Sequence, residues 1–186
     1  MSEQADSHKA APSHSERAGQ ADAPKGSERS HTLLVLANNE PGMVDRVVGV
    51  LRRRRAQPQT ISIGQSEIPN VSRITIHMND SEVGVEQLVE QLRKIVDVRH
   101  IVNLSSEQAV ARELALVKVN AAAESRAEII EMGNLFGAHI VDLAQETVTL
   151  EVTGSEEKIE KLVALLQRFG VREIARTGSV AMIRDM

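Results

Sequence analysis

Apolar and polar positions along the chain recur with two different periods, which predicts an α+β protein. A short apolar run before a turn is typical of a buried strand, strict alternation indicates a half-buried strand, and apolar residues at every third or fourth position indicate a helix. In the first half these patterns predict helices that begin at Met43 and Ser81, and strands at 32–37, 60–64, 72–78 and 98–104. The resulting order, βαββαβ, is the ferredoxin-like arrangement.

The second half of the chain repeats this plan. Its patterns predict helices at 125–136 and 155–169, and strands at 114–119, 138–143, 147–152 and 171–182. Four apolar helix positions also recur at a constant offset of 74 residues: Val85, Leu88, Val89 and Leu92 match Ile159, Leu162, Val163 and Leu166. An internal repeat changes the domain count. We therefore expect two tandem ferredoxin-like (βαββαβ) domains.

Composition sets the expected boundaries of these domains. Residues 1–30 contain no Leu, Ile, Val or Phe, and no Met after Met1. Such a segment cannot bury enough apolar area to offset the entropy of ordering it, so we expect a disordered tail. The domains are then expected at 31–105 and 113–186, with 106–112 as a short polar linker that is compatible with a helix.

Charge and residue content exclude several classes of protein. The 186 residues carry a net charge of −4, and they include no Cys, no Trp, no Tyr and only two Phe. Disulfides, thiolate zinc sites and cysteine nucleophiles are therefore excluded, and stacking platforms for nucleic-acid bases are disfavoured. No apolar run approaches the roughly 20 residues of a membrane span, and the N-terminus lacks the apolar part of a signal peptide. We expect a soluble cytoplasmic protein.

A search for catalytic motifs finds none. The six histidines include no pair with metal-ligand spacing such as HExxH, and the chain has no GxSxG, GxGxxG or Walker loop. We therefore expect neither a catalytic site nor a bound metal or cofactor.

The segment that carries most chemical information joins the first strand to the first helix. It runs Asn38-Asn39-Glu40-Pro41-Gly42-Met43-Val44. The first amides of a helix lack intrahelical partners and lie at the positive end of its dipole, so they suit the carboxylate of a free amino acid. Gly42 permits close approach of a ligand. The alternative is that this segment is simply a turn followed by a helix start.

Four consecutive arginines, Arg52–Arg55, form a basic patch with Arg46. Basic residues at the end of a helix are favoured by its dipole, so a solvated helix end explains the patch. Contact with an acidic partner, or with nucleic acid, is the functional alternative.

The order and spacing of several segments resemble the small regulatory subunits of acetolactate synthase. In the first half the resemblance covers 36–42, 46–49, 72–76 and 91–98, and it identifies that half as an ACT domain. In the second half, Arg112–Val119 is similar to the start of the C-terminal domain of that family.

The resemblance implies a protein that regulates an enzyme and has no active site of its own. In this family the large catalytic subunit, a transferase, uses thiamine diphosphate, Mg²⁺ and FAD, and the small subunit raises its activity. The small subunit also confers feedback inhibition by valine or related branched-chain amino acids. ACT domains pair side by side as a homodimer, and the effector binds at their interface. Its binding positions correspond here to Asn39 and Gly42, with neighbours Pro41, Met43 and Val44.

The sequence departs from the family pattern after the first helix. The family has Arg-Gly-Tyr-Asn-Ile, where the Asn contacts the effector, and this chain has Arg54-Arg55-Ala56-Gln57-Pro58. Gln57 keeps the amide and adds a methylene, Arg55 replaces the Gly, and Pro58 replaces the Ile. We therefore expect Gln57 and Pro58 to line a reshaped pocket. Two alternatives remain open: a stand-alone ACT-type sensor of another enzyme or of transcription, and a nucleic-acid-binding protein that uses the arginine patch.

Overall fold

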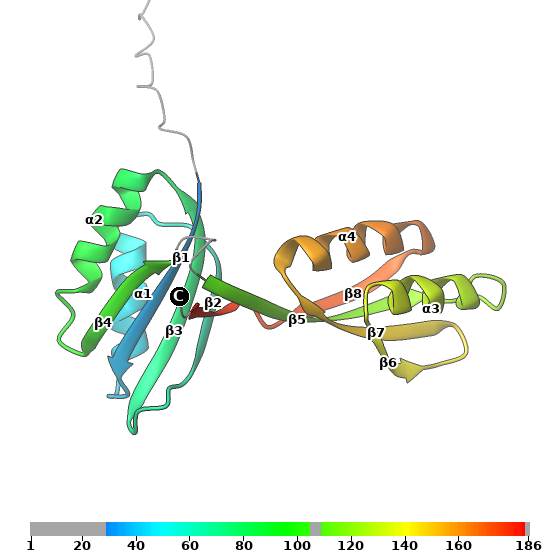
Figure 1. Cartoon of the computed structure of the whole chain (residues 1–186), viewed down its shortest axis with the longest axis horizontal. Coiled ribbons are helices and arrows are strands. Elements are labelled where there is room, and N and C mark those ends of the chain that lie inside the picture. The colour runs from blue at the N-terminus through cyan, green and yellow to red at the C-terminus, as the bar shows by residue number, and fades with distance from the viewer. Residues whose placement is uncertain (1–28, 105–108, 185–186) are drawn as a thin grey trace, which may run out of the picture.

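The computed structural model describes residues 29–104 and 109–184, and the elements of its first domain follow the predicted order. An antiparallel sheet in the order β2–β3–β1–β4 carries two helices on one face (Figure 1). The elements are β1 (Arg29–Asn38), α1 (Met43–Arg53), β2 (Pro58–Gln65), β3 (Val71–Asp80), α2 (Glu82–Leu92) and β4 (Val98–Leu104). The expected ferredoxin-like arrangement is confirmed, with β2 and β4 at the edges of the sheet.

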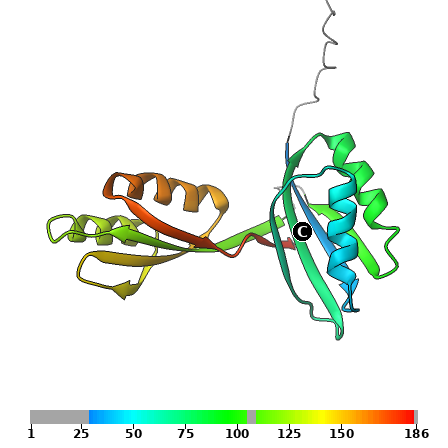
Figure 2. The same ribbon diagram turned by 180° about the vertical axis from the view of Figure 1, so that it is seen from behind.

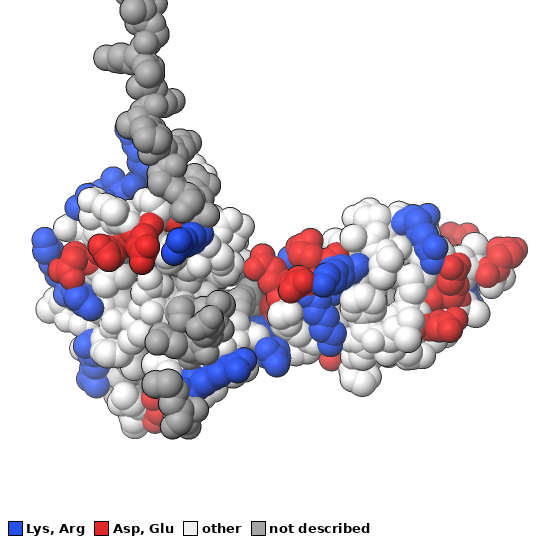
Figure 3. Space-filling view, turned by 45° about the horizontal axis from the view of Figure 1, so that its top comes forward, with Lys and Arg blue, Asp and Glu red and all other residues white. Residues whose placement is uncertain are grey.

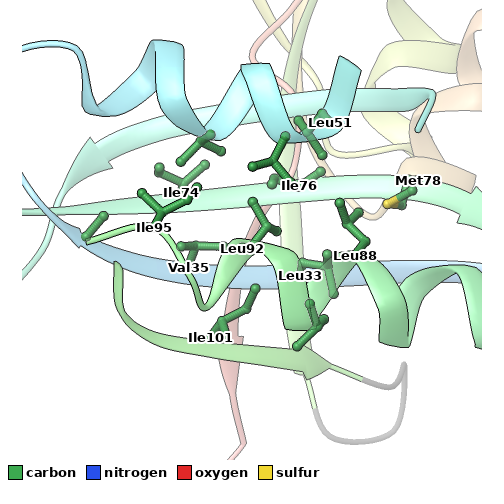
Figure 4. Close-up of a cluster of buried hydrophobic side chains, with 14 of the residues drawn as sticks. Leu33, Val35, Leu51, Ile74, Ile76, Met78, Leu88, Leu92, Ile95 and Ile101 are labelled. Carbon is green, nitrogen blue, oxygen red and sulfur yellow. The ribbon is translucent and has the colours of Figure 1, made fainter. Parts of the chain in front are cut away.

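The core of this domain is aliphatic, as the composition requires. Leu33, Val35, Ile74 and Ile76 project from the central strands β1 and β3 and are fully buried against the helices (Figure 4). Helix α2 begins where the sequence predicts, because the Ser81 hydroxyl accepts a hydrogen bond of 3.1 Å from the Gly84 amide.

The second domain has the same strand order, β6–β7–β5–β8, with two helices on one face. Ser155 caps its last helix as Ser81 caps α2, by accepting from the Lys158 amide at 3.3 Å. The elements are β5 (Ala109–Asn120), α3 (Arg126–Leu135), β6 (His139–Leu143), β7 (Thr147–Gly154), α4 (Glu156–Leu166), a 3₁₀ turn (Gln167–Phe169), β8 (Val171–Arg176) and β9 (Val180–Ile183).

Two expectations about the connections between elements need correction. Residues 109–112 were expected to belong to a linker compatible with a helix. They form the first four residues of strand β5 instead. Strand β1 begins at Arg29, two residues before the expected start of order. The expected tail up to residue 28, and the linker residues 106–108, lie outside the described residues.

The start of β5 joins the two domains. Residues 109–112 pair with β9 as a two-stranded ribbon, which lies on the helix-free face of the first sheet (Figures 1 and 2). Ala181 of β9 packs with Leu34 and Leu104 of the first domain. The Arg73 guanidinium donates to the Ala181 carbonyl at 2.9 Å. Each domain thus has its own core, and the ribbon forms a third apolar cluster between them.

Charged side chains gather where α4 begins, next to this ribbon (Figure 3). His77 Nε2 of β3 lies 3.2 Å from Glu156 Oε2, which links the first sheet to the first turn of α4.

Glu113 of β5 is only 4% exposed, and its Oε1 has no hydrogen-bond partner among the described residues. Burial raises the pKa of the Glu113 carboxyl, since an apolar environment disfavours its charged form. Arg176 and His77 oppose that rise in pKa, whereas Glu156 and Glu160 reinforce it.

Replacing Glu113 by Gln should therefore raise the free energy of unfolding, by an amount that grows with pH. Because the folded-state pKa is raised, the wild-type carboxyl contributes fully to stability only below its ordinary pKa, 4.5. That contribution is lost as the pH rises through the raised value. Urea unfolding of both proteins at about pH 4 and about pH 7 measures the difference. An equal gain at both values would contradict this assignment, and Glu131→Gln on the exposed face of α3 is the control.

Candidate functional site

The connection between β1 and α1 is a type II turn that the sequence specifies residue by residue. Pro41 and Gly42 occupy its central positions, and the Met43 amide donates to the Glu40 carbonyl at 3.0 Å. Gly42 has φ 77° and ψ 4°, the left-handed conformation that this turn requires at its third position and that favours glycine. Helix α1 therefore begins at Met43, directly after the turn. Met43 is buried and Val44 is 39% exposed.

Neighbouring segments hold this turn in place. The Asn39 amide donates to the Asn70 carbonyl at 2.8 Å, and the Asn38 amide donates to the Asp97 carbonyl at 2.8 Å. The Arg99 guanidinium also donates to the Asn38 side-chain oxygen. The loop is therefore tied to the β2–β3 turn on one side and to the start of β4 on the other.

A partly buried ion pair fixes the start of α1. Arg46 Nε donates to Asp97 Oδ2 at 2.6 Å, and the Asp97 side chain is only 7% exposed. A second nitrogen of the Arg46 guanidinium donates to the Pro41 carbonyl at 3.2 Å. A Cβ atom added at Gly42 would lie 3.1 Å from the same guanidinium. The turn is therefore closely packed against Arg46, which leaves little room for any residue but glycine.

Two amides of the first turn of α1 remain available to a ligand. No side chain caps this helix, and the amides of Val44 and Asp45 have no acceptor among the described residues. A pocket of about 280 Å³ lies beside Asn39, between that loop and the β2–β3 turn. Its lining residues are Asn39, Gln65, Ser66, Ile68, Pro69, Asn70, Val71 and Ser72. Of the expected site residues this lining includes Asn39 and none of Pro41, Gly42, Met43 and Val44.

Gln57 and Pro58 do not lie beside this loop in the same chain. Pro58 pairs with Met78, whereas the loop follows Asn38, which pairs with Val71 at the other end of β3. The two sets of expected site residues are thus about 20 Å apart along the sheet. One chain brings Asn39, Pro41, Gly42, Met43 and Val44 together and leaves Gln57 and Pro58 at the opposite end.

The arginine patch follows α1 at that opposite end. The amides of Arg55 and Ala56 still donate to the helix carbonyls of Arg52 and Leu51, each at 3.0 Å. Arg55 adopts φ 55°, a left-handed conformation. This conformation favours glycine, so the structure gives a physical reason for the Gly that the resemblance places at this position. Residues 52–55 are all exposed, consistent with a solvated helix end.

The groups that this loop offers to a ligand are hydrogen-bond donors and acceptors. No group of three or more His, Asp or Glu side chains suited to a metal occurs within residues 29–104 and 109–184. No helix in the described ranges is long and apolar enough to cross a membrane. The loop itself offers amides, side-chain amides and one ion pair, none of which is a nucleophile paired with a base.

Sequence reasoning missed the residues that position the loop. The sequence places Arg46 in the basic patch and in a segment that carries the resemblance, and it assigns neither Asp97 nor Asn70 a role in the site. The one signal for Asp97 is a lone carboxylate in the apolar stretch 95–98, because such a residue needs a partner when it is buried. Nothing in the sequence pairs it with Arg46, which is 51 residues away.

Each of the two domains matches a model of a known protein family. Residues 33–100 match the family model described as the AHAS small subunit-like ACT domain. Residues 112–185 match the model described as the small subunit of acetolactate synthase.

Individual relatives agree with these matches over most of the chain. A probable acetolactate synthase small subunit of Archaeoglobus fulgidus is 40% identical over 154 residues, which is 83% of this chain and 96% of that protein. The acetolactate synthase small subunit of Mycolicibacterium smegmatis is 41% identical over 83% of this chain and 91% of its own length. The crystal structure of the acetolactate synthase small subunit from Thermotoga maritima superimposes with a TM-score of 0.79 at 35% identity, covering 85% of this chain and 99% of that chain.

The Arg46–Asp97 pair makes a testable contribution to the stability of the loop. Arg46→Ala should lower the free energy of unfolding by about 1–2 kcal/mol, because it leaves the buried Asp97 carboxylate without its partner. The loss stays this small because solvent around the half-exposed arginine already weakens the ion pair. Urea unfolding measures this change in the free energy of unfolding, and Arg53→Ala at the exposed end of α1 is the control. In the Asp97→Asn background the Arg46→Ala loss should shrink, and an unchanged loss there would contradict the pairing.

Proposed function

The chain belongs to the family of acetolactate synthase small subunits, and from that premise we propose that it activates a large catalytic subunit and places it under feedback control by a branched-chain amino acid. The thiamine diphosphate, Mg²⁺ and FAD of the reaction would be held by the catalytic subunit. This chain would contribute a binding site for the effector, valine or a related amino acid, and a surface that contacts the catalytic subunit.

The observation that carries the effector assignment is the loop after β1. The free amides of Val44 and Asp45 lie at the positive end of the α1 dipole, where a carboxylate is stabilised. The carboxylate of an amino acid fits these amides, and Asn39 beside the pocket supplies polar groups for its ammonium. Glycine at position 42 keeps a side chain out of the narrow space beside the Arg46 guanidinium.

The effector site would be completed by a second copy of the chain. Strand β2 is an edge of the first sheet, and such an edge presents unpaired backbone groups to another chain. If two β2 strands pair antiparallel across a two-fold axis, the Pro58 end of one lies beside the Gln65 end of the other. That pairing brings Gln57 and Pro58 of one copy towards the Asn39 loop of its partner. We therefore propose a homodimer through the ACT domains with effector sites at their interface.

Reconstitution tests this function. The chain alone should form no acetolactate, and it should raise the turnover of its catalytic subunit. Valine, leucine or isoleucine should then lower the stimulated rate. Gly42→Asp should keep the activation and raise the amino-acid concentration needed for inhibition by roughly tenfold or more. The reason is that the new carboxylate would repel the carboxylate of the ligand.

Gly137→Asp is the matched control for that variant. Gly137 also has positive φ, at 62°, and it lies in the second domain with only the Lys158 ammonium near its Cβ position. It therefore reproduces the backbone strain without touching the loop. Activity of the isolated chain, or an unchanged effector response in Gly42→Asp, would contradict the proposal.

A further inference from the structure

The two domains meet at a narrow waist, where strand β5 changes its partners (Figures 1 and 2). Residues 109–112 of this strand pair with β9 in the ribbon, whereas residues 113–120 pair with β7 of the second sheet. None of the strands that pair with β5 spans both Arg112 and Glu113. The chain crosses the waist again between β8 and β9, where Gly178 has φ 75°. The waist therefore has the form of a hinge between the ribbon and the second sheet.

A side-chain contact outside the ribbon holds the second domain against the first sheet. The side chain of His77 is 13% exposed, and its Nε2 lies 3.2 Å from Glu156 Oε2 of α4. Ser30 Oγ lies 3.3 Å from the same nitrogen, and Thr32 Oγ1 lies 3.1 Å from Nδ1. The carboxylate and both hydroxyls can accept hydrogen bonds, so the surroundings suit a ring that carries a proton on each nitrogen. In that charged form the contact with Glu156 is an ion pair across the waist.

Glu113 lies at the hinge, among groups of both signs. It is 4% exposed, and its Oε1 has no hydrogen-bond partner in the part of the chain that the structure describes. The charged groups around it are Arg176 of β8, Glu156 and Glu160 of α4, and His77 of β3. Arg176 already pairs with Glu160, at 2.7 Å. These five residues form what we call the junction cluster, in which an ionised Glu113 adds a carboxylate to two others.

We propose that the junction cluster makes the contact between the two domains depend on pH, so that protons hold the second domain against the first sheet and their loss lets it turn about the waist. With protons bound, His77 attracts Glu156, and a neutral Glu113 stays buried beside them. With the protons lost, that attraction ends and the charge on Glu113 repels Glu156. The ribbon keeps its apolar contact with Leu34 in both arrangements. This response needs no effector, so it is separate from the proposed amino-acid site.

The direction of the response follows from where the protons bind. In the docked arrangement burial raises the pKa of Glu113 above its ordinary value of 4.5, and Glu156 and Glu160 reinforce that rise. Turning the second domain would bring this carboxyl into water and return its pKa towards the ordinary value. The docked arrangement therefore binds more protons, and the ratio of docked to turned chains should fall by up to about tenfold per pH unit for each proton released. Histidine ordinarily loses its charge between about pH 5 and 8, which acts in the same direction.

Distances between the domains test the proposal, and spin labels can report them because the chain has no cysteine. Val96→Cys and Leu135→Cys place one label on each domain, at positions that are 86% and 79% exposed. The doubly labelled chain is diluted with unlabelled chain, so that only distances within one chain are measured, and is frozen at intervals from about pH 4.5 to about pH 8. Pulsed electron resonance should give one narrow distance in acid and an added, broader population at the highest pH. Far-UV circular dichroism should stay constant, because each domain has its own core.

Two substitutions separate the contributions of the junction cluster. Glu113→Gln imitates the protonated carboxyl, so it should lower the ratio of turned to docked chains at about pH 8 by about tenfold or more. His77→Gln keeps a hydrogen-bonding side chain that cannot become charged, so the broad population should appear already in acid. Glu131→Gln on α3 and His100→Gln on β4 replace exposed residues of the same types, and both controls should respond to pH as the wild type does.

The outcomes decide between turning and other causes. A distance distribution that stays the same from acid to about pH 8 overturns the proposal. So does a pH response that Glu113→Gln and His77→Gln both leave unchanged, because groups outside the junction cluster would then cause it. A broad population that appears only with loss of the circular dichroism signal also overturns it, since it reports unfolding. A response without any amino acid that either variant removes supports the proposal, whatever the effector titrations give.

Discussion

The strand order of the first sheet is the constraint on which the other features depend. Since β1 and β3 occupy the centre, β2 is left at an edge and runs antiparallel to β3. The start of β2 at Pro58 therefore lies at the opposite end of the sheet from the Asn39 loop. Residues that suit one amino-acid ligand are thus separated within a chain, and the same open edge offers the means of bringing them together between two chains.

Much of the fold could be predicted from the sequence because its signals are local. The helical spacing of apolar residues, the capping serines Ser81 and Ser155 and the Pro41-Gly42 turn each depend on a few neighbouring residues. The ribbon could not be predicted, since residues 109–112 form a strand only by pairing with β9, about 70 residues later. The Arg46–Asp97 pair and the separation of Gln57 from the loop are likewise consequences of tertiary structure, on which a linear pattern carries no information.

The junction between the domains gives a physical route by which events at β2 can reach the second domain. Ser62 of that strand donates to the Thr177 carbonyl, and His77 on the neighbouring strand contacts Glu156 at the start of α4. Glu113 lies buried near these groups, and one of its oxygens has no hydrogen-bond partner within residues 29–104 and 109–184, so its raised pKa makes the junction less stable at neutral pH than in acid.

The central claim is that each effector site takes its loop from one chain and Gln57 from the other. Mixed dimers of a Gly42→Asp chain and a Gln57→Ala chain, purified with two different affinity tags, test it most directly. One site then combines both substitutions, and the other contains neither. Calorimetric titration should give one bound amino acid per mixed dimer at wild-type affinity. Loss of all wild-type binding in the mixed dimer would contradict the shared site, because it would mean that both groups act within a single chain.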